Sequence, residues 1–276
     1  MTPRALVLAV PAVLAFATAA FAPTASAAPS PVGMTHRNVP VCSAPASGAA
    51  ACDAIRHDRL TAAGHVIPNA TPAGYGPADL QSAYALPSAT SATWKTAGVG
   101  QVVAIVDAYN DPSALSDVNI YRSQFGIAPL STCTSPSPAL STNQPCFSKV
   151  NQSGGTRYPK SNGGWAQEIS LDLDMVSAVC PNCSVLLVEA TSPTFINLGA
   201  AVNQAVTLGA TEISNSYGGG ESSSDASYDA SYFKHPGVAI TVSSGDGGYG
   251  VQYPAASQYV TAVGGTSLTR SSSTRG

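Results

Sequence analysis

Apolar positions between residues 102 and 263 form short blocks that alternate between two periods. Residues 102–106 are a continuous apolar run that ends at Asp107, which is typical of a fully buried strand. Residues with helical spacing follow, and further short apolar runs lie between them. The predicted helices are 117–125, 165–179, 195–208 and 228–233, and the other predicted strands are 185–188, 212–216, 238–243 and 259–263. Strands that alternate with helices predict an α/β fold, in which helices cover both faces of a parallel sheet.

The N-terminal residues have the pattern of an export signal. Arg4 precedes an apolar stretch at residues 5–22, and Ala-Ser-Ala at 25–27 then supplies the small residues that signal peptidase accepts. We therefore predict a signal peptide at residues 1–27 and a secreted, extracellular protein that is free of the membrane after cleavage. A membrane anchor is the alternative, but Pro11 interrupts the stretch and no basic stop-transfer flank follows it.

The stretch after the signal is dominated by Ala, Pro, Ser and Gly and shows no sustained period. We interpret residues 28–75 as a short pro-segment or linker and residues 76–276 as the folded domain. Within this domain, residues 132–164 are rich in Ser, Thr, Pro, Gly and Asn, which predicts a long surface loop.

Six cysteines in an exported chain are most simply interpreted as three disulfides. Their spacing groups them locally, although spacing alone leaves the connectivity open. The Cys-Pro-Asn-Cys pair at 180–183 has an alternative as a redox or zinc motif, but the sequence offers no second such pair and no nearby His. The local couples are Cys42 with Cys52, Cys133 with Cys146, and Cys180 with Cys183.

Charge is scarce and nearly balanced. Lys and Arg number 12 against 15 Asp and Glu, which gives a formal net charge of −3, and the basic residues are scattered along the chain. A nucleic-acid partner needs a dense basic face, so this class of function is excluded. Charged residues make up only 10% of the chain, against roughly 25% in an average soluble domain. A cluster of acidic residues is therefore more informative here than in a charge-rich protein.

One acidic cluster lies on the predicted helix that begins near Trp165. Glu168 and Asp172 are four residues apart and share a face of this helix, with Cβ atoms about 5–6 Å apart, whereas Asp174 points away. Two carboxyls at one site can hold one proton between them and act as base and orienting acid at acidic pH. Trp165 lies on the same face and would shield Glu168 from water. The alternative is a solvated acidic face without a catalytic role.

Other reaction and ligand classes find less support. In a parallel sheet the ligand site lies beyond the carboxyl ends of the strands, which here are followed by Asp107, residues 215–220 and residues 243–248. No histidine follows Asp107 in a position to serve as a triad base, since His235 lies in a Lys-His-Pro-Gly turn, and the sequence has no Gly-x-Ser-x-Gly elbow. The Gly-Val-Gly at 98–100 precedes its strand, whereas a dinucleotide-binding loop would follow it.

Five motifs, taken in their order, resemble those of the sedolisins, a family of serine-carboxyl peptidases with a subtilisin-like fold. The resemblance runs from about residue 76 to the C-terminus. It implies a serine-type endopeptidase that hydrolyses peptide bonds in proteins or peptides at acidic pH. The motifs are GVGQVVAIVD at 98–107, EISLDLD at 168–174, SNSYG at 214–218, SSGDG at 243–247, and YPA at 253–255 with AVGGT at 262–266.

The resemblance also implies roles for individual residues. Glu168 would be the general base, Asp172 its partner, and Asp246 a protonated side chain that donates to the oxyanion. The glycine-rich exit of the strand near residue 216 offers an open backbone edge for an extended peptide, with a plain loop as the alternative. The residues expected to bind substrate are Ser216, Tyr217, Gly218 and Gly219.

The sequence departs from the family pattern in three respects. The family's nucleophile is a serine in a later Gly-Thr-Ser segment that opens a helix, whereas Ser267 matches the motif before it and has no predicted helix behind it. We therefore expect a chain that is cut short, without the nucleophile, the end of the sheet or the family's calcium site, and with no cofactor ligated by the residues present. Tyr217 stands where Trp is common, and the pro-segment is short. The alternative function is a non-catalytic extracellular module, or pseudoenzyme, that binds peptides.

Overall fold

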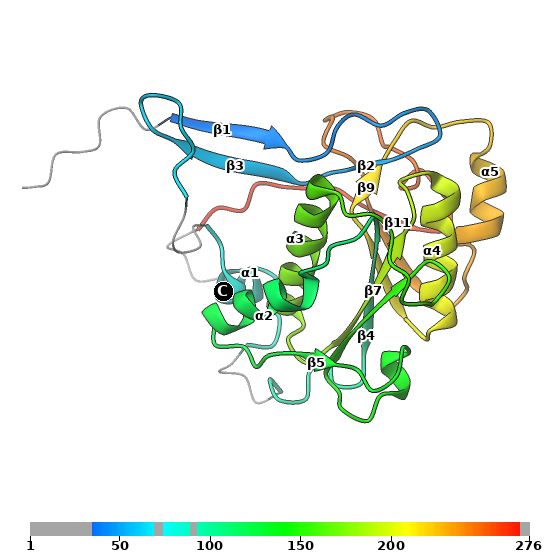
Figure 1. Ribbon diagram of the computed structural model, residues 1–276, viewed down its shortest axis with the longest axis horizontal. Coiled ribbons are helices and arrows are strands. Elements are labelled where there is room, and N and C mark those ends of the chain that lie inside the picture. The colour runs from blue at the N-terminus through cyan, green and yellow to red at the C-terminus, as the bar shows by residue number, and fades with distance from the viewer. Residues whose placement is uncertain (1–34, 69–73, 89–92, 271–276) are drawn as a thin grey trace, which may run out of the picture.

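The computed structural model describes residues 35–68, 74–88 and 93–270, and its centre is a seven-stranded parallel sheet (Figure 1). The strands are β4 (Val102–Ala108), β5 (Ser131–Thr132), β6 (Cys146–Asn151), β7 (Ser184–Ala190), β8 (Glu212–Asn215), β10 (Ala239–Ser243) and β11 (Thr261–Val263). Their order across the sheet is β11-β10-β8-β4-β7-β6-β5, and every neighbouring pair is parallel. The α/β fold predicted from the alternating pattern is therefore confirmed.

Helices cover both faces of this sheet (Figure 1). The helices are α1 (Pro77–Ala83), α2 (Ala114–Gln124), α3 (Gly163–Val179), α4 (Phe195–Thr207) and α5 (Asp225–Tyr228), which continues into a π-helical turn at Asp229–Phe233. Side chains alternate along β4, so Ile105 packs with Ile169 of α3, whereas Val106 packs with Leu198 of α4 on the opposite face. The helices and strands lie close to their predicted ranges, although α2 begins at Ala114, before the predicted start.

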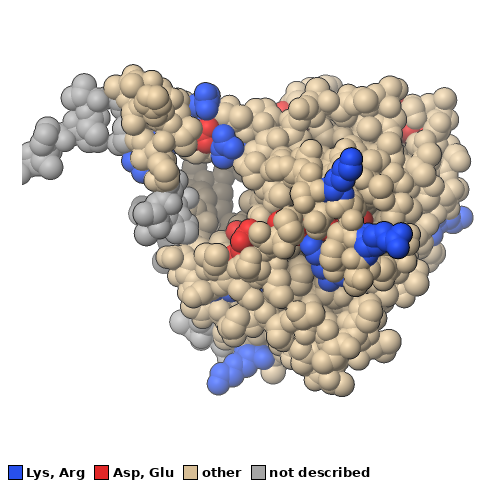
Figure 2. Space-filling view, viewed as in Figure 1, with Lys and Arg blue, Asp and Glu red and all other residues tan. Residues whose placement is uncertain are grey.

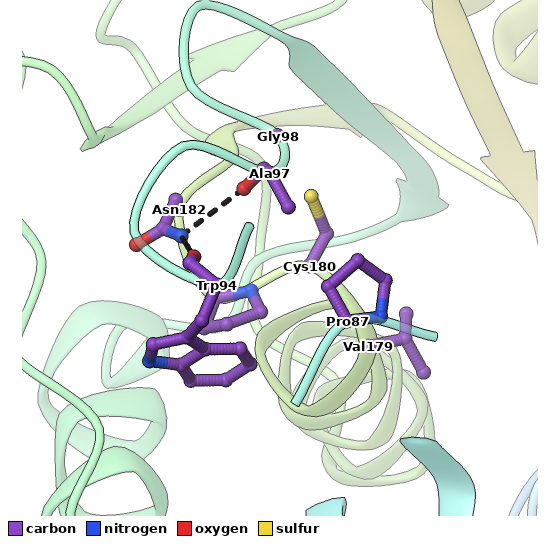
Figure 3. A pocket seen from close by; sticks show the side chains of 8 residues that line it. Pro87, Trp94, Ala97, Gly98, Val179, Cys180 and Asn182 are labelled. Atoms are coloured by element: carbon purple, nitrogen blue, oxygen red, sulfur yellow. Dashed lines mark hydrogen bonds between the residues drawn. The ribbon is translucent and has the colours of Figure 1, made fainter. Parts of the chain in front are cut away.

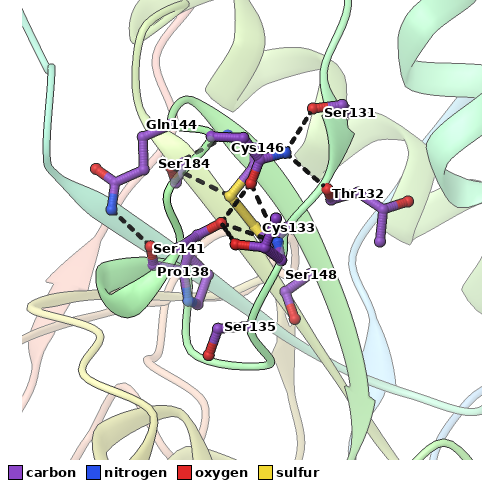
Figure 4. Close-up of a disulfide and its surroundings, with 12 residues drawn as sticks. Ser131, Thr132, Cys133, Ser135, Pro138, Ser141, Gln144, Cys146, Ser148 and Ser184 are labelled. Carbon is purple, nitrogen blue, oxygen red and sulfur yellow. Dashed lines mark hydrogen bonds between the residues drawn. A yellow bond between two sulfur atoms is a disulfide. The ribbon is translucent and has the colours of Figure 1, made fainter.

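The surface loop predicted for residues 132–164 is wrong in its middle, where β6 is a buried strand between β5 and β7. The sequence pattern did not indicate a buried strand here because β6 contains polar residues. These residues form hydrogen bonds with partners in other parts of the fold. Lys149 of β6, for example, donates a hydrogen bond of 2.8 Å to the side chain of Asn110. The disulfide between Cys133 and Cys146 joins the start of β6 to the residue after β5 (Figure 4).

The N-terminal segment, predicted to be irregular, contains a hairpin and a short strand. β1 (Thr35–Pro40) pairs antiparallel with β3 (Ile55–Leu60), and β2 (Ala51–Cys52) pairs antiparallel with β9 (Tyr217–Gly218) of the folded domain. Arg37 and Arg56 both bond the buried carboxylate of Asp58 within the hairpin, and the hydrogen bond from Arg56 lowers the pKa of Asp58 to about 2. The prediction of an aperiodic segment is therefore wrong for these residues.

The three disulfides have the local pairing that the sequence favoured. The Cys180–Cys183 bond closes the turn between α3 and β7, beside a cavity of about 150 Å³ (Figure 3). In this turn Asn182 donates hydrogen bonds to the carbonyl oxygens of Trp94 and Ala97. The disulfide therefore holds a packed turn, and within the described ranges no group of His, Cys, Asp or Glu is placed to hold a metal ion.

Most of the visible surface is neither acidic nor basic, as the low content of charged residues requires (Figure 2). The signal peptide predicted for residues 1–27 lies outside the described residues. In the part of the chain that the structure describes, none of the helices has both the length and the apolar character needed to cross a bilayer.

Candidate active site

Helix α3 carries the predicted carboxyl pair and begins at a well-defined cap. The side chain of Asn162 accepts hydrogen bonds from the backbone N–H groups of Gly164 and Trp165, which fixes the start of the helix. Glu168 and Asp172 then follow on its inner face and are only 2% and 9% exposed. This burial rules out the alternative of a solvated acidic face.

Burial also changes the protonation of the pair. It is the main cause that raises the pKa of Glu168, and the charge of Asp172 acts in the same direction. Burial likewise raises the pKa of Asp172, and the charge of Asp53 adds to this effect. The charges that act on the pair thus come from other carboxylates. Glu168 and Asp172 therefore keep their protons to a higher pH than isolated carboxyls do.

A third carboxyl, Asp107 at the end of β4, belongs to the same buried cluster. Its side chain is fully buried, and neither of its oxygens has a hydrogen-bond partner among the described residues. Burial raises its pKa well above the ordinary value, and the charges of Asp172, Glu168 and Glu189 raise it further. Sequence reasoning noted Asp107 only as the residue after a strand. The signal that could have identified it is an acid at the end of an otherwise apolar buried strand.

The residues that follow β8 lie next to the carboxyl pair of Glu168 and Asp172. Ser216 donates a hydrogen bond of 2.8 Å from its Oγ to Oδ1 of Asp172, while Oδ2 of Asp172 is buried without a partner among the described residues. Tyr217 was expected to bind substrate, but its side chain is buried, donates to Asn215 and packs against Trp165. The Tyr217 side chain therefore belongs to the core, and the Tyr217 backbone lies opposite Cys52 of β2 in the strand register.

The backbone edge predicted to be open at Gly218 and Gly219 is already paired. Gly218 pairs with Ala51 of β2, and Gly219 exchanges two backbone hydrogen bonds of 2.9 Å with Tyr253. A Cβ at Gly219 would collide with the carbonyl oxygen of Ala49, so glycine is required for this close approach. The edge does hold an extended strand at Gly218, and that strand comes from the N-terminal segment.

Asp246 lies exposed in the turn after β10. Asp53 of the N-terminal segment accepts a hydrogen bond of 2.6 Å from Ser243 Oγ at the end of β10. Burial raises the pKa of Asp53, the Ser243 hydrogen bond opposes this, and the charge of Asp246 adds to it. The charge of Asp53 in turn acts on Glu168 and Asp172. The charge of Asp53 is thus linked electrostatically to each of the three predicted catalytic carboxyls.

Ser267, the serine of the single Gly-Thr-Ser sequence, is exposed. Its neighbour Leu268 accepts a hydrogen bond from Tyr75, and Arg270 forms an ion pair with Asp79 of α1. Across the ranges that the structure describes, no hydrogen bond joins Ser267 to the carboxyl cluster.

Two comparisons with known proteins bear on this site. Kumamolisin from Bacillus sp. (strain MN-32) is 28% identical over 221 residues, a match that covers 74% of this chain and 36% of kumamolisin. The solved structure of Pseudomonas sedolisin, a serine-carboxyl proteinase complexed with two molecules of pseudo-iodotyrostatin, matches with a TM-score of 0.55 at 22% identity. That match covers 74% of this chain and 56% of the sedolisin chain. The chain therefore spans about a third to a half of the length of these relatives. No family model matches it.

Proposed function

We propose that this chain, which has the subtilisin-like fold of the sedolisin family, is the carboxyl-bearing part of a secreted serine-carboxyl endopeptidase that hydrolyses proteins at acidic pH. Its relationship to kumamolisin and its likeness to the sedolisin structure support a peptidase. The observation that carries the proposal is the buried pair of Glu168 and Asp172 beside a backbone edge that holds an extended strand.

In the proposed reaction, Glu168 accepts the proton of an attacking serine hydroxyl, while Asp172 orients Glu168 and holds the remaining proton of the pair. Because the charges around them are carboxylates, one member of the pair stays neutral while the other is ionised. Asp246, in its neutral form, would donate a hydrogen bond to the oxyanion. Among the described residues, the serine hydroxyl that contacts the pair is that of Ser216. We therefore propose that the nucleophile is the serine of the later Gly-Thr-Ser segment that the resemblance implies. None of the residues named here is proposed as a ligand of the family's calcium ion.

The proposal is tested with the product of the complete gene and acid-denatured haemoglobin as substrate, between about pH 3 and about pH 8. Glu168→Gln, Asp172→Asn and Asp246→Asn should each lower kcat by about 100-fold or more, because each keeps the shape but removes a proton-transfer or oxyanion role. Asp174→Asn on the same helix is the matched control and should change kcat far less. Comparable losses at Asp174 and Glu168 would contradict the assignment.

A non-catalytic peptide-binding module is the second candidate. The observation that favours it is the occupied edge at Gly218, which binds an extended strand through backbone pairing alone. Binding of peptides by the complete gene product without any hydrolysis across the same pH range would make this function the better one.

A further inference from the structure

Helix α2 carries an arginine whose charge is buried without an acidic partner. Arg122 is only 1% exposed, and burial lowers its pKa to about 10. Its guanidinium donates to the carbonyl oxygen of Ala128 at 2.6 Å, to Ser177 Oγ at 3.1 Å and to the carbonyl oxygen of Pro181 at 2.8 Å. None of these three partners is a carboxylate. The positive charge is therefore hydrogen-bonded but not neutralised by them.

One of these partners belongs to the turn that joins α3 to β7. Pro181, whose carbonyl oxygen accepts from Arg122, lies between the two cysteines of the Cys180–Cys183 disulfide. The Cys-x-x-Cys spacing of this pair is one in which thiol pKa values are often lowered, and a nearby cation has the same effect. The disulfide itself carries no charge. Reduction would thus give the buried guanidinium a thiolate as counter-charge, and this favours the reduced form.

A small thiol also has access to one of the two sulfurs. Cys180 is partly exposed and lines the cavity of about 150 Å³ beside the turn, whereas Cys183 is only 2% exposed (Figure 3). The sulfur of Cys180 is therefore the atom open to attack. The cavity is smaller than the roughly 300 Å³ at which sites for drug-sized ligands begin. It can thus admit the sulfur-bearing end of a small thiol, but not a larger ligand.

We propose that the Cys180–Cys183 disulfide is a site of reversible exchange with small thiols, and that Arg122 stabilises its reduced form. The thiolate of one small thiol attacks Cys180 Sγ and forms a mixed disulfide, while Cys183 Sγ leaves with the electron pair of the broken S–S bond. A second small thiolate attacks the first at its sulfur, which releases Cys180 and completes a small disulfide. Two electrons pass to the two cysteines, and the protons of the small thiols pass to the cysteines or to solvent.

The test measures the exchange of each disulfide of the full chain separately. The folded chain is equilibrated with mixtures of reduced and oxidised glutathione, its free thiols are trapped with N-ethylmaleimide, and each cysteine pair is quantified by peptide mass spectrometry. Arg122→Met removes the guanidinium, whereas Arg122→Lys keeps a positive charge and is the matched control. The disulfides Cys42–Cys52 and Cys133–Cys146 serve as references in the same sample.

We expect the ratio of reduced to oxidised Cys180–Cys183 at a given glutathione mixture to fall about tenfold in Arg122→Met, which corresponds to about one pKa unit of lost thiolate stabilisation. Arg122→Lys should stay close to the unaltered chain, and the two reference disulfides should not change. An unchanged ratio in Arg122→Met would overturn the inference. A similar fall at all three disulfides would overturn it as well, because the substitution would then act through the fold. An equal fall in Arg122→Lys would assign the effect to hydrogen bonds and not to charge, which contradicts the proposed role of Arg122.

A second measurement on the unaltered chain keeps the inference falsifiable if Arg122→Met does not fold. In a time course with reduced glutathione under native conditions, Cys180–Cys183 should open about tenfold faster than the two reference disulfides, because a stabilised thiolate is a better leaving group. The glutathione adduct trapped during the exchange should lie on Cys180. Opening of Cys180–Cys183 no faster than that of the reference disulfides would overturn the inference.

Discussion

Two buried acidic clusters lie next to each other in the sheet, and they are neutralised in different ways. Asp107 of β4 pairs with Glu189 of β7 in the strand register. Glu189 has a cation, because Lys149 Nζ lies 3.4 Å from its Oε1, and the same oxygen accepts the Asp111 N–H at 2.9 Å. Asp107, in contrast, faces the carboxyls of Glu168 and Asp172, and both of its oxygens lack a partner among the described residues.

The difference separates a carboxyl that has a cationic partner from carboxyls whose charged neighbours are other carboxyls. At Glu189, the ammonium group of Lys149 and the backbone N–H of Asp111 favour the charged carboxylate and oppose the rise in pKa that burial causes. Carboxyls that are buried against one another instead favour their protonated forms, and they release protons only as the pH rises through their raised pKa values. We therefore expect the Lys149–Glu189 pair to hold the strand ends in place, and the Asp107, Glu168 and Asp172 cluster to exchange protons.

The largest expected effect tests the cation of the first cluster. Lys149→Met would leave Glu189 buried without its ammonium partner, and breaking a buried ion pair in this way costs up to about 3 kcal/mol of unfolding free energy at a pH where the carboxyl is ionised. Urea unfolding at about pH 9 measures this loss. At about pH 4.5 the loss should be smaller, because burial raises the pKa of Glu189 to about 7 and the carboxyl can take up a proton.

The control for this variant is Lys95→Met, at an exposed position outside both clusters, which should change the unfolding free energy by less than about 0.5 kcal/mol. If Lys149→Met lowers the unfolding free energy at about pH 9 as little as this control does, the ion pair does not stabilise the fold and the two clusters do not differ in their response to charge.

The second prediction concerns the pH dependence of the unaltered chain. A carboxyl whose pKa is higher in the folded than in the unfolded state stabilises the fold below its unfolded pKa of about 4, and this stability is lost as the pH rises through the folded pKa. Asp107, Glu168 and Asp172 all have raised pKa values. Thermal unfolding should therefore occur several degrees lower at about pH 8 than at about pH 4.5.

The carboxylate of Asp58 in the N-terminal hairpin does not affect the comparison of unfolding at these two pH values. The pKa of Asp58 is lowered to about 2, so the stability that it contributes is lost only as the pH falls below the range compared. A thermal unfolding midpoint that is higher at about pH 8 than at about pH 4.5 would show that protonation of the acidic cluster does not stabilise the fold.

The third prediction concerns a variant in which Asp107 of the second cluster can no longer ionise. Asp107→Asn keeps the shape of the side chain but cannot ionise, so it should raise the unfolding midpoint at about pH 8, by about 3 °C for each 1 kcal/mol gained. Little change is expected at about pH 4.5, because burial raises the pKa of Asp107 and favours its neutral form at acidic pH. Glu221→Gln, which removes an exposed carboxylate, is the matched control. Equal shifts at the two pH values would mean that Asp107 is not part of the titrating cluster.

The sheet could be predicted from the sequence where its strands are apolar, and it was missed where they are not. Strands such as β4 and β7 are buried on both faces and therefore appear as continuous apolar runs. The strand β6 contains Ser148 and Lys149, and their partners lie in other parts of the chain, so its composition resembled that of a loop. The strands of the N-terminal hairpin are mostly polar and exposed, so neither shows an apolar face.

The candidate site shows the same limit. Spacing on one helix predicted that Glu168 and Asp172 share a face, because helical geometry is local. The contact between Glu168 and the Ala54 N–H joins residues 114 positions apart, and Ala54 lies between the two-residue strand β2 and β3, in a segment with no apolar pattern. Asp107 was noted at the end of its strand, but its neutral state depends on burial against other carboxyls, which only the fold establishes.

The smallest expected effect comes from Ser216, the residue whose hydroxyl donates to the second cluster within the described ranges. Ser216→Ala removes the hydrogen bond to Oδ1 of Asp172, and that bond is stronger when the carboxylate is ionised. The loss should raise the pKa of Asp172 further and cost about 1 kcal/mol of unfolding free energy at about pH 8, with a smaller cost at about pH 4.5. Urea unfolding at both pH values measures this, with Ser227→Ala, an exposed serine of α5, as the control. A larger loss at the acidic pH would contradict the comparison, since the hydroxyl would then bind a neutral carboxyl more strongly than an ionised one and Asp172 would not be the group that titrates.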